Sequence, residues 1–118
     1  MTVTLITLLK RRPGMNKADF ITYYETHHRC IGEEVLSGYA SRYVRRFLHP
    51  ADNIDQDHDF DVVMEIDFPD QATMEACFAA MQPPEITDRI IADEERLFDR
   101  SRNRVFTVED HASALPDP

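Results

Sequence analysis

The sequence contains few of the residues that build disulfide frameworks, fibrous repeats or flexible linkers. Its 118 residues include only three glycines and two cysteines, Cys30 and Cys77. So little glycine excludes a fibrous repeat or a glycine-rich linker, and two cysteines are too few for a disulfide-stabilised scaffold. We therefore expect a single domain over residues 1–118 with reduced cysteines, as in the cytoplasm.

Long apolar runs are also missing. The run at residues 2–9 is about eight residues long, which cannot span a bilayer. Its basic residues come after the apolar stretch, at Lys10, Arg11 and Arg12, and no small-residue cleavage site follows, so it does not resemble a secretory signal peptide. We expect no interaction with a membrane.

Positive charge is scarce. The chain has 13 Lys and Arg against 22 Asp and Glu, a formal net charge of -9. Residues 1–50 hold eight basic and four acidic residues, and the remainder holds five and eighteen. Most of such a surface repels a polyanion, which argues against nucleic-acid binding.

Apolar residues recur with periods that alternate between strand and helix. Residues 2–10 are typical of a short buried strand. After the Pro13-Gly14 break, Asn16 is a good N-cap for a helix that runs to about Leu36 and ends at Gly38. Beyond it, the sequence predicts strands over 39–49 and 59–68, a helix capped by Asp70, a further helix over about 85–98, and a last strand around Val105.

Helical periodicity of about 100° per residue predicts which side chains are buried. In the first helix the predicted buried stripe consists of Phe20, Tyr24, Ile31 and Val35. His27 lies just outside one edge of this stripe, and His28 lies just outside the other. In the helix after Asp70 the predicted stripe consists of Met74, Cys77, Phe78 and Met81. His28 therefore lies beside the core, one turn after Tyr24, and we expect it to face the space between helix and sheet.

The two central strands predict an antiparallel hairpin. Matching apolar to apolar residues also brings arginines opposite acids. The expected cross-strand pairs are Phe47 with Phe60, Tyr43 with Met64, Val44 with Val63, Arg46 with Asp61, and Arg42 with Glu65.

The order β-α-β-β-α-β is that of the α+β, ferredoxin-like fold, a four-stranded antiparallel sheet with helices on one face. The other face keeps apolar side chains that nothing else in a chain of this length can cover. We therefore expect a homodimer through facing sheets. The polar residues 110–118 are expected to be a flexible tail or to lie on a partner.

Four segments together resemble the EthD family, named for ethyl tert-butyl ether degradation, in the dimeric α+β barrel superfamily. They are the basic Pro-Gly turn Lys10–Met15; Phe20, Tyr23, Tyr24 and His28; Gly38, Arg42, Tyr43 and Val44; and Asp93, Glu94, Phe98 and Asp99. One departure is that Arg29, Cys30 and Ile31 follow His28, where the family often has a small residue, proline and leucine. The resemblance implies a small oxygenated, aromatic or cyclic ligand, no cofactor, and a barrel formed by two chains.

His28 is the leading candidate for chemistry, because an imidazole exchanges protons near neutral pH. The alternative is a structural histidine bonded to a backbone carbonyl. Tyr24 is expected either to be a core residue or to bond a substrate oxygen or orient His28. Asp93 and Asp99 could be the acid partner of His28, general bases, or solvated capping residues.

Arg45 is predicted between Tyr43 and Phe47 on the aromatic face of its strand, where an unpaired guanidinium is costly to bury. It either pairs with an acid such as Asp99 or binds a substrate oxygen, and Tyr43 and Asp99 are its expected neighbours in substrate binding. A metal site is not expected, because adjacent His27 and His28 diverge by about 100° on a helix. No glycine-rich phosphate loop is present.

These observations favour a cofactor-independent enzyme, a lyase, dehydratase or isomerase of a catabolic or tailoring pathway, with His28 as general acid or base. Two alternatives remain open: a non-catalytic ligand-binding or accessory protein of a degradation operon, and a cofactor-free oxygenase. Fold class does not separate them.

Overall fold

The computed structural model describes all residues, 1–118. The elements in chain order are β1 (Val3–Leu9), α1 (Lys17–Tyr23), the π-helical turn η1 (Tyr24–His28), α2 (Arg29–Leu36), β2 (Arg42–Phe47), β3 (Val62–Phe68), α3 (Gln71–Ala80), α4 (Pro84–Glu95), the 3-10 turn η2 (Arg100–Arg102) and β4 (Arg104–Thr107). The predicted α+β order is confirmed. None of the helices is long and apolar enough to cross a membrane.

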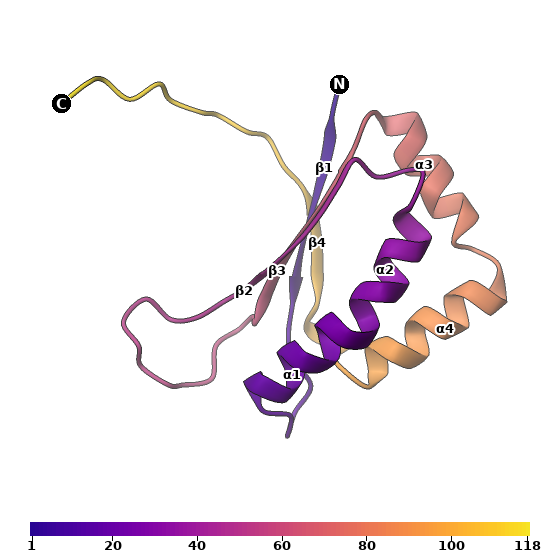
Figure 1. The fold of residues 1–118 in the computed structure, drawn as a ribbon, viewed down its shortest axis with the longest axis horizontal. Coiled ribbons are helices and arrows are strands. Elements are labelled where there is room, and N and C mark those ends of the chain that lie inside the picture. Colours follow the sequence, from indigo (N-terminus) through magenta and orange to yellow (C-terminus); the bar gives the residue numbers. More distant parts are fainter.

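The four strands form one antiparallel sheet in the order β2-β3-β1-β4. All helices lie on one face of this sheet (Figure 1). Because side chains alternate along a strand, Leu5, Thr7 and Leu9 of β1 are buried beneath the helices, while Ile6 and Leu8 lie on the other face. We call that uncovered side the open face.

The predicted hairpin register is wrong by two residues. Phe47 lies opposite Val62 and Arg45 opposite Met64. In this register the two carboxylate oxygens of Glu65 each accept a hydrogen bond at 3.1 Å, one from Arg42 and one from Arg46. Since a shift of two residues keeps every side chain on its face, the predicted inward orientation of the aromatic residues of β2 still holds.

Asp61 is therefore not the partner of Arg46. Its carboxylate is buried and accepts a hydrogen bond at 2.9 Å from the backbone N–H of Arg11. The ammonium of the buried Lys10 lies 3.7 Å from it and also binds Asp57 at 2.6 Å and the His58 carbonyl at 2.5 Å. Together these contacts attach the polar loop between β2 and β3 to the end of β1.

Both predicted helix caps are present. The Asn16 side chain accepts from the Asp19 N–H at 2.8 Å, and the Asp70 side chain accepts from the Thr73 N–H at 2.7 Å. The predicted burial of Phe78 is wrong, since it is 37% exposed. It lies at the outer side of α3, beyond the buried Met74 and Cys77.

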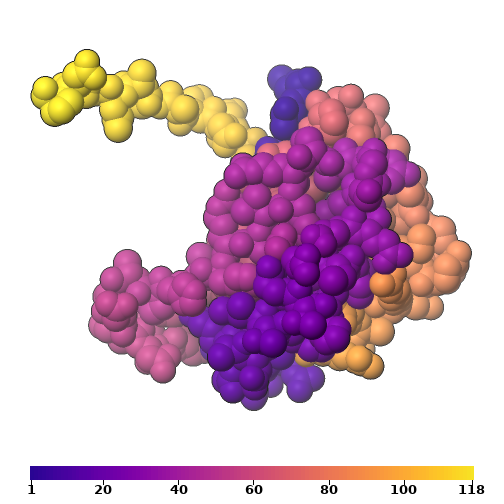
Figure 2. Space-filling model, viewed as in Figure 1, coloured from indigo at the N-terminus to yellow at the C-terminus, as the bar shows by residue number.

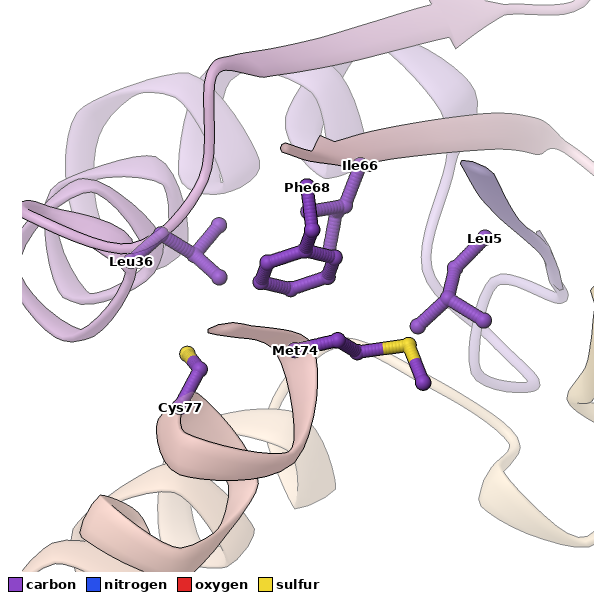
Figure 3. Packing of buried hydrophobic residues seen from close by; sticks show 6 residues of the cluster. All are labelled: Leu5, Leu36, Ile66, Phe68, Met74 and Cys77. Carbon is purple, nitrogen blue, oxygen red and sulfur yellow. The ribbon is translucent and has the colours of Figure 1, made fainter. Parts of the chain in front are cut away.

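Two clusters of buried side chains fill the space between helices and sheet. One joins α2 and α3 to the strands, as Figure 3 shows; its members are Leu5, Leu36, Ile66, Phe68, Met74 and Cys77. The other lies under α1, η1 and the turn after α4; its members are Leu9, Phe20, Tyr24, Val62, Leu97 and Phe98. The second cluster supports the candidate site.

Two segments project from the body. The loop between β2 and β3 and the tail after β4, residues 108–118, both extend away from the helices (Figures 1 and 2). The tail is exposed throughout.

Candidate functional site

The side chains of Tyr23 on α1 and His28 on η1 both contact Asp93 on α4. Its Oδ2 lies 2.9 Å from Nδ1 of His28, and its Oδ1 accepts a hydrogen bond at 2.5 Å from the hydroxyl of Tyr23. A carboxylate only accepts hydrogen bonds, so Nδ1 of His28 carries the proton, and Nε2 is the nitrogen left for another partner. We call Tyr23, His28 and Asp93 the Asp93 cluster.

The π-helical turn explains how Tyr23 and His28 reach the same carboxylate. At 100° per residue, positions five apart on an α-helix diverge by about 140°. In a π-turn the hydrogen bond spans five residues, as from the Arg29 N–H to the Tyr24 carbonyl. Residues five apart are then one turn apart, so both side chains point to α4.

The prediction of one regular helix through residues 24–28 is therefore wrong at its centre. The expected start at Asn16 and end after Leu36 are correct, but α1 and α2 are joined by η1. Such turns are rare and often occur at functional sites.

The imidazole of His28 is largely buried, with 13% of its side chain exposed. Its ring packs edge-on against Tyr24, with centroids 5.2 Å apart, and against Phe98 at 5.3 Å. The space between helix and sheet that we expected His28 to face is not open. Rings of Phe20, Tyr24 and Phe98 occupy it, and His28 does not line any of five hollows on the surface.

Tyr24 is completely buried, and its hydroxyl lies 3.5 Å from the sulfur of Met64. A thioether is a weak acceptor. Burial, and then the neighbouring Tyr43 phenol, raise the pKa of Tyr24 well above its ordinary value. This tyrosine remains protonated and positions the edge of His28.

Arg45 faces the helices as predicted, but its acid partner is Glu25 on η1 and not Asp99. Its Nε and Nη2 bind the two Glu25 oxygens at 3.0 and 2.7 Å, a paired geometry that favours arginine. The guanidinium also lies over the ring of Tyr43, 4.8 Å from the centroid. Nη1 makes no hydrogen bond within the chain.

Asp99 lies in a different place. Its carboxylate accepts a hydrogen bond from Ser101, and it lines a polar cleft with Lys10, Arg12 and Asp57 at the end of β1. The structure thus brings together His28, Tyr24 and Asp93, and separately Arg45 and Tyr43, but directs Asp99 elsewhere.

Glu94 is the acid beside the Asp93 cluster. Burial raises the pKa of its carboxyl, while Arg100 and His28 act in the opposite direction. Arg100 Nε lies 3.9 Å from Oε1, beyond hydrogen-bond distance, and no other side chain donates to this carboxylate.

The roles of Tyr23, Glu25 and Glu94 were not predicted from the residue pattern. A regular period of 100° per residue points the Tyr23 side chain away from that of His28. No feature of the residue pattern predicts the π-turn that brings the two together. Asp93, considered as an acid partner for His28, does fill that role. No group of three or more His, Cys, Asp or Glu residues is placed to hold a metal ion.

Comparison with known proteins gives a family and a set of similar folds. Residues 12–101 match the family model described as the EthD domain. No curated protein is significantly similar in sequence.

The solved structures share the fold at low identity. An ethyl tert-butyl ether degradation (EthD) family protein from Bacillus halodurans has 16% identity and a TM-score of 0.65, over 94% of this chain and 100% of that one. A dimeric protein of unknown function with a ferredoxin-like fold from Bacteroides fragilis has 10% identity and a TM-score of 0.59, over 92% and 96%. SnoaB, a cofactor-independent oxygenase from Streptomyces nogalater, has 14% identity and a TM-score of 0.57, over 98% of each chain.

Proposed function

Because this chain belongs to the EthD domain family, we propose that it is a cofactor-independent small-molecule enzyme in which His28 transfers a proton. The observation that carries the proposal is the contact of 2.9 Å between Asp93 and Nδ1 of His28. A histidine oriented by a carboxylate, with its second nitrogen free, is suited to general acid-base catalysis.

In this mechanism Nε2 of His28 takes a proton from the substrate or gives one to its leaving oxygen. Asp93 stabilises the imidazolium that forms when the ring gains a proton. Tyr23 holds the other carboxylate oxygen and so fixes the orientation of Asp93. Burial and this hydrogen bond raise the pKa of Tyr23, which keeps its hydroxyl a donor.

The substrate class follows from the family and from the apolar surroundings of the ring. We propose an oxygenated aromatic or cyclic compound that approaches the exposed edge of His28 and undergoes loss of water, cleavage beside a carbonyl, or isomerisation. Arg45 is the proposed anchor for its oxygen, through the free Nη1 above Tyr43. Asp99 has no part in this mechanism, because its side chain lines a separate cleft.

A cofactor-free oxygenase is the second candidate, supported by the shared fold with SnoaB, which is described as such an enzyme. An accessory ligand-binding protein is the third, and it would bind a compound without changing it. Oxygen consumption separates these cases, since a lyase or isomerase works equally well without oxygen.

The proposal is tested by turnover of a panel of aromatic and cyclic hydroxy and keto compounds, followed by mass spectrometry with and without oxygen. His28→Gln should lower any turnover by about a hundredfold or more, because it removes the proton-transferring nitrogen. The control is His27→Gln, which changes the adjacent histidine; its ring packs on Tyr23 at 4.7 Å but makes no hydrogen bond to Asp93, so this variant should retain activity. Equal loss in both variants, or near-normal turnover by His28→Gln, would contradict the role of His28.

We also propose that the protein is a homodimer through its open face. Apolar side chains gather there from four strands, in the residues Ile6, Leu8, Val44, Val63 and Phe106. Phe106 is 49% exposed in the single chain. The projecting loop and tail leave a concave space beside the body (Figure 2), into which a second copy would fit.

A further inference from the structure

A second site lies on the far side of Glu94, between α3 and α4. These helices are joined by a short turn and pack at the same edge of the molecule (Figure 1). Between them is a hollow of about 290 Å³, whose apolar lining consists of Phe78, Met81, Ile90 and Ile91 and whose polar lining includes Glu94 and Arg100. We call it the α3–α4 hollow. It is separate from the Asp93 cluster.

The side chains of the hollow are ones that a ligand would bury. Phe78 contacts the buried Phe68 edge-on at 6.0 Å, yet 37% of it remains exposed. Met81, Ile90 and Ile91 are each only partly buried. An apolar concavity with a few converging polar groups is the usual form of a small-molecule site, and this volume is at the small end of their range.

Glu94 is the polar group that lacks a partner. Only 24% of its side chain is exposed, and no donor in the chain forms a hydrogen bond with it. Partial burial raises the pKa of this carboxyl, and its oxygens remain accessible to a ligand. A ligand hydroxyl at this position would donate the missing hydrogen bond.

The charges of the hollow favour an uncharged ligand. Glu94 and Arg100 carry opposite charges 3.9 Å apart and offset each other. An anion would be repelled by the Glu94 carboxylate, and a cation would be repelled by the Arg100 guanidinium.

We propose that the α3–α4 hollow binds a small, uncharged, largely apolar molecule through one hydroxyl group that donates a hydrogen bond to Glu94. The apolar residues of α3 and α4 hold its hydrocarbon part. This site does not rest on the function proposed for His28, because it can be measured as binding without turnover.

The test uses three probes of similar shape, benzyl alcohol, toluene and benzoate, added to the full chain carrying methyl-labelled Met and Ile. Benzyl alcohol should produce saturable NMR shifts in the methyls of Met81, Ile90 and Ile91, with none at Ile6 on the opposite side of the sheet. Toluene should reach the same methyls, and benzoate should not. Ile91→Trp, which fills the hollow, should abolish the shifts.

Glu94→Leu tests the polar contact at nearly constant volume. It should lower the affinity for benzyl alcohol relative to toluene by about threefold or more, because one hydrogen bond is lost. Glu94→Gln should keep the native ratio, since an amide still offers a donor and an acceptor. The matched control is Glu95→Leu on the exposed side of α4, which should leave the ratio unchanged.

Three results would overturn the proposal. They are the absence of saturable shifts in the native chain, shifts that persist in Ile91→Trp, and an unchanged probe ratio in Glu94→Leu. Binding of benzoate as strong as that of benzyl alcohol would exclude the uncharged ligand class. Loss of His28-dependent turnover affects none of these measurements, so the two proposals fail independently.

Discussion

Asp93 is the side chain on which the proposed chemistry depends. It is buried on α4 and has two donors, one for each carboxylate oxygen. Such pairing is what allows a carboxylate to be buried, since an unpaired charge in the same place would be strongly destabilising. Tyr23 therefore stabilises the fold and positions His28 through Asp93.

Tyr23 and Tyr24 are neighbours with very different hydroxyl groups. Tyr23→Phe removes a hydrogen bond to a carboxylate and should lower the free energy of unfolding by about 1.5 kcal/mol. Tyr24→Phe removes a hydroxyl that neighbours a thioether and the Tyr43 phenol, neither of them charged, and should cost less than about 1 kcal/mol, although the residue is fully buried. Urea denaturation at pH 7 measures both. A larger loss in Tyr24→Phe than in Tyr23→Phe would contradict this assignment of partners.

The tyrosines also predict how stability changes with pH. The pKa values of Tyr23, Tyr24 and Tyr43 are raised in the folded chain, mainly by burial. A raised pKa means that the unfolded chain loses these protons first, so their contribution is complete below about pH 10 and is lost as pH rises toward the folded values.

Unfolding free energies measured between pH 8 and pH 11 should therefore fall above about pH 10. Tyr24→Phe should make this fall shallower, because the pKa of Tyr24 is raised the most. Tyr23→Phe, with a smaller shift, is the comparison and should change the slope less. If the slope of unfolding free energy against pH is the same in Tyr24→Phe as in the native chain, the Tyr24 phenol does not govern the loss of stability at high pH.

The first helix combines two features that place its side chains. The π-turn η1 aligns Tyr23 with His28. In α2, Gly32 lies where the side chain of Tyr43 on β2 approaches the helix. A Cβ at position 32 would lie 2.7 Å from the Tyr43 hydroxyl oxygen and 2.9 Å from its ring carbons. Only glycine permits α2 and β2 to pack this closely.

Gly32→Ala is accordingly expected to destabilise the protein. Helix propensity alone favours alanine by about 1 kcal/mol, but overpacking against Tyr43 costs about 1 to 3 kcal/mol. The expected result is a net loss in urea denaturation. Tyr43→Phe removes the closest atom, so the double variant should recover part of that loss in a double-mutant cycle. If the effects of the two substitutions on the free energy of unfolding are strictly additive, the strain does not arise between positions 32 and 43.

The whole molecule presents one covered and one uncovered side of its sheet. Helices and two buried clusters occupy the first, while the open face has apolar residues beside the Arg42–Glu65–Arg46 ion pairs. Burying this face against a second copy would remove exposed apolar area and cover Phe106.

Dimerisation through the open face is tested with a single charge. The native chain should have twice the 13.7 kDa mass of one chain by light scattering, and Ile6→Glu should reduce it to one chain while keeping its fold by circular dichroism. Ala76→Glu adds the same charge on the exposed side of α3 and should remain dimeric. A native mass of 13.7 kDa, or dimers in Ile6→Glu, would contradict the proposed interface.

Local patterns were sufficient for much of the architecture. The caps at Asn16 and Asp70, the helix end before Gly38 and the alternation in β2 and β3 depend on interactions between near neighbours in sequence, and these predictions were confirmed. The strand face that carries Arg45 was also predicted correctly, whereas the contact of Asp93 with His28 was one of three alternatives that the sequence left open.

Long-range contacts decided the rest. The register of β2 on β3 differs from the one predicted by matching residue types and places Glu65 diagonally between two arginines. The partner of Arg45 depends on η1 passing over β2. The filled space beneath His28 depends on how rings from three elements pack together. Alternation and capping follow from the backbone of one segment, whereas a π-turn, a shared carboxylate and a closed or open cavity exist only when distant segments meet.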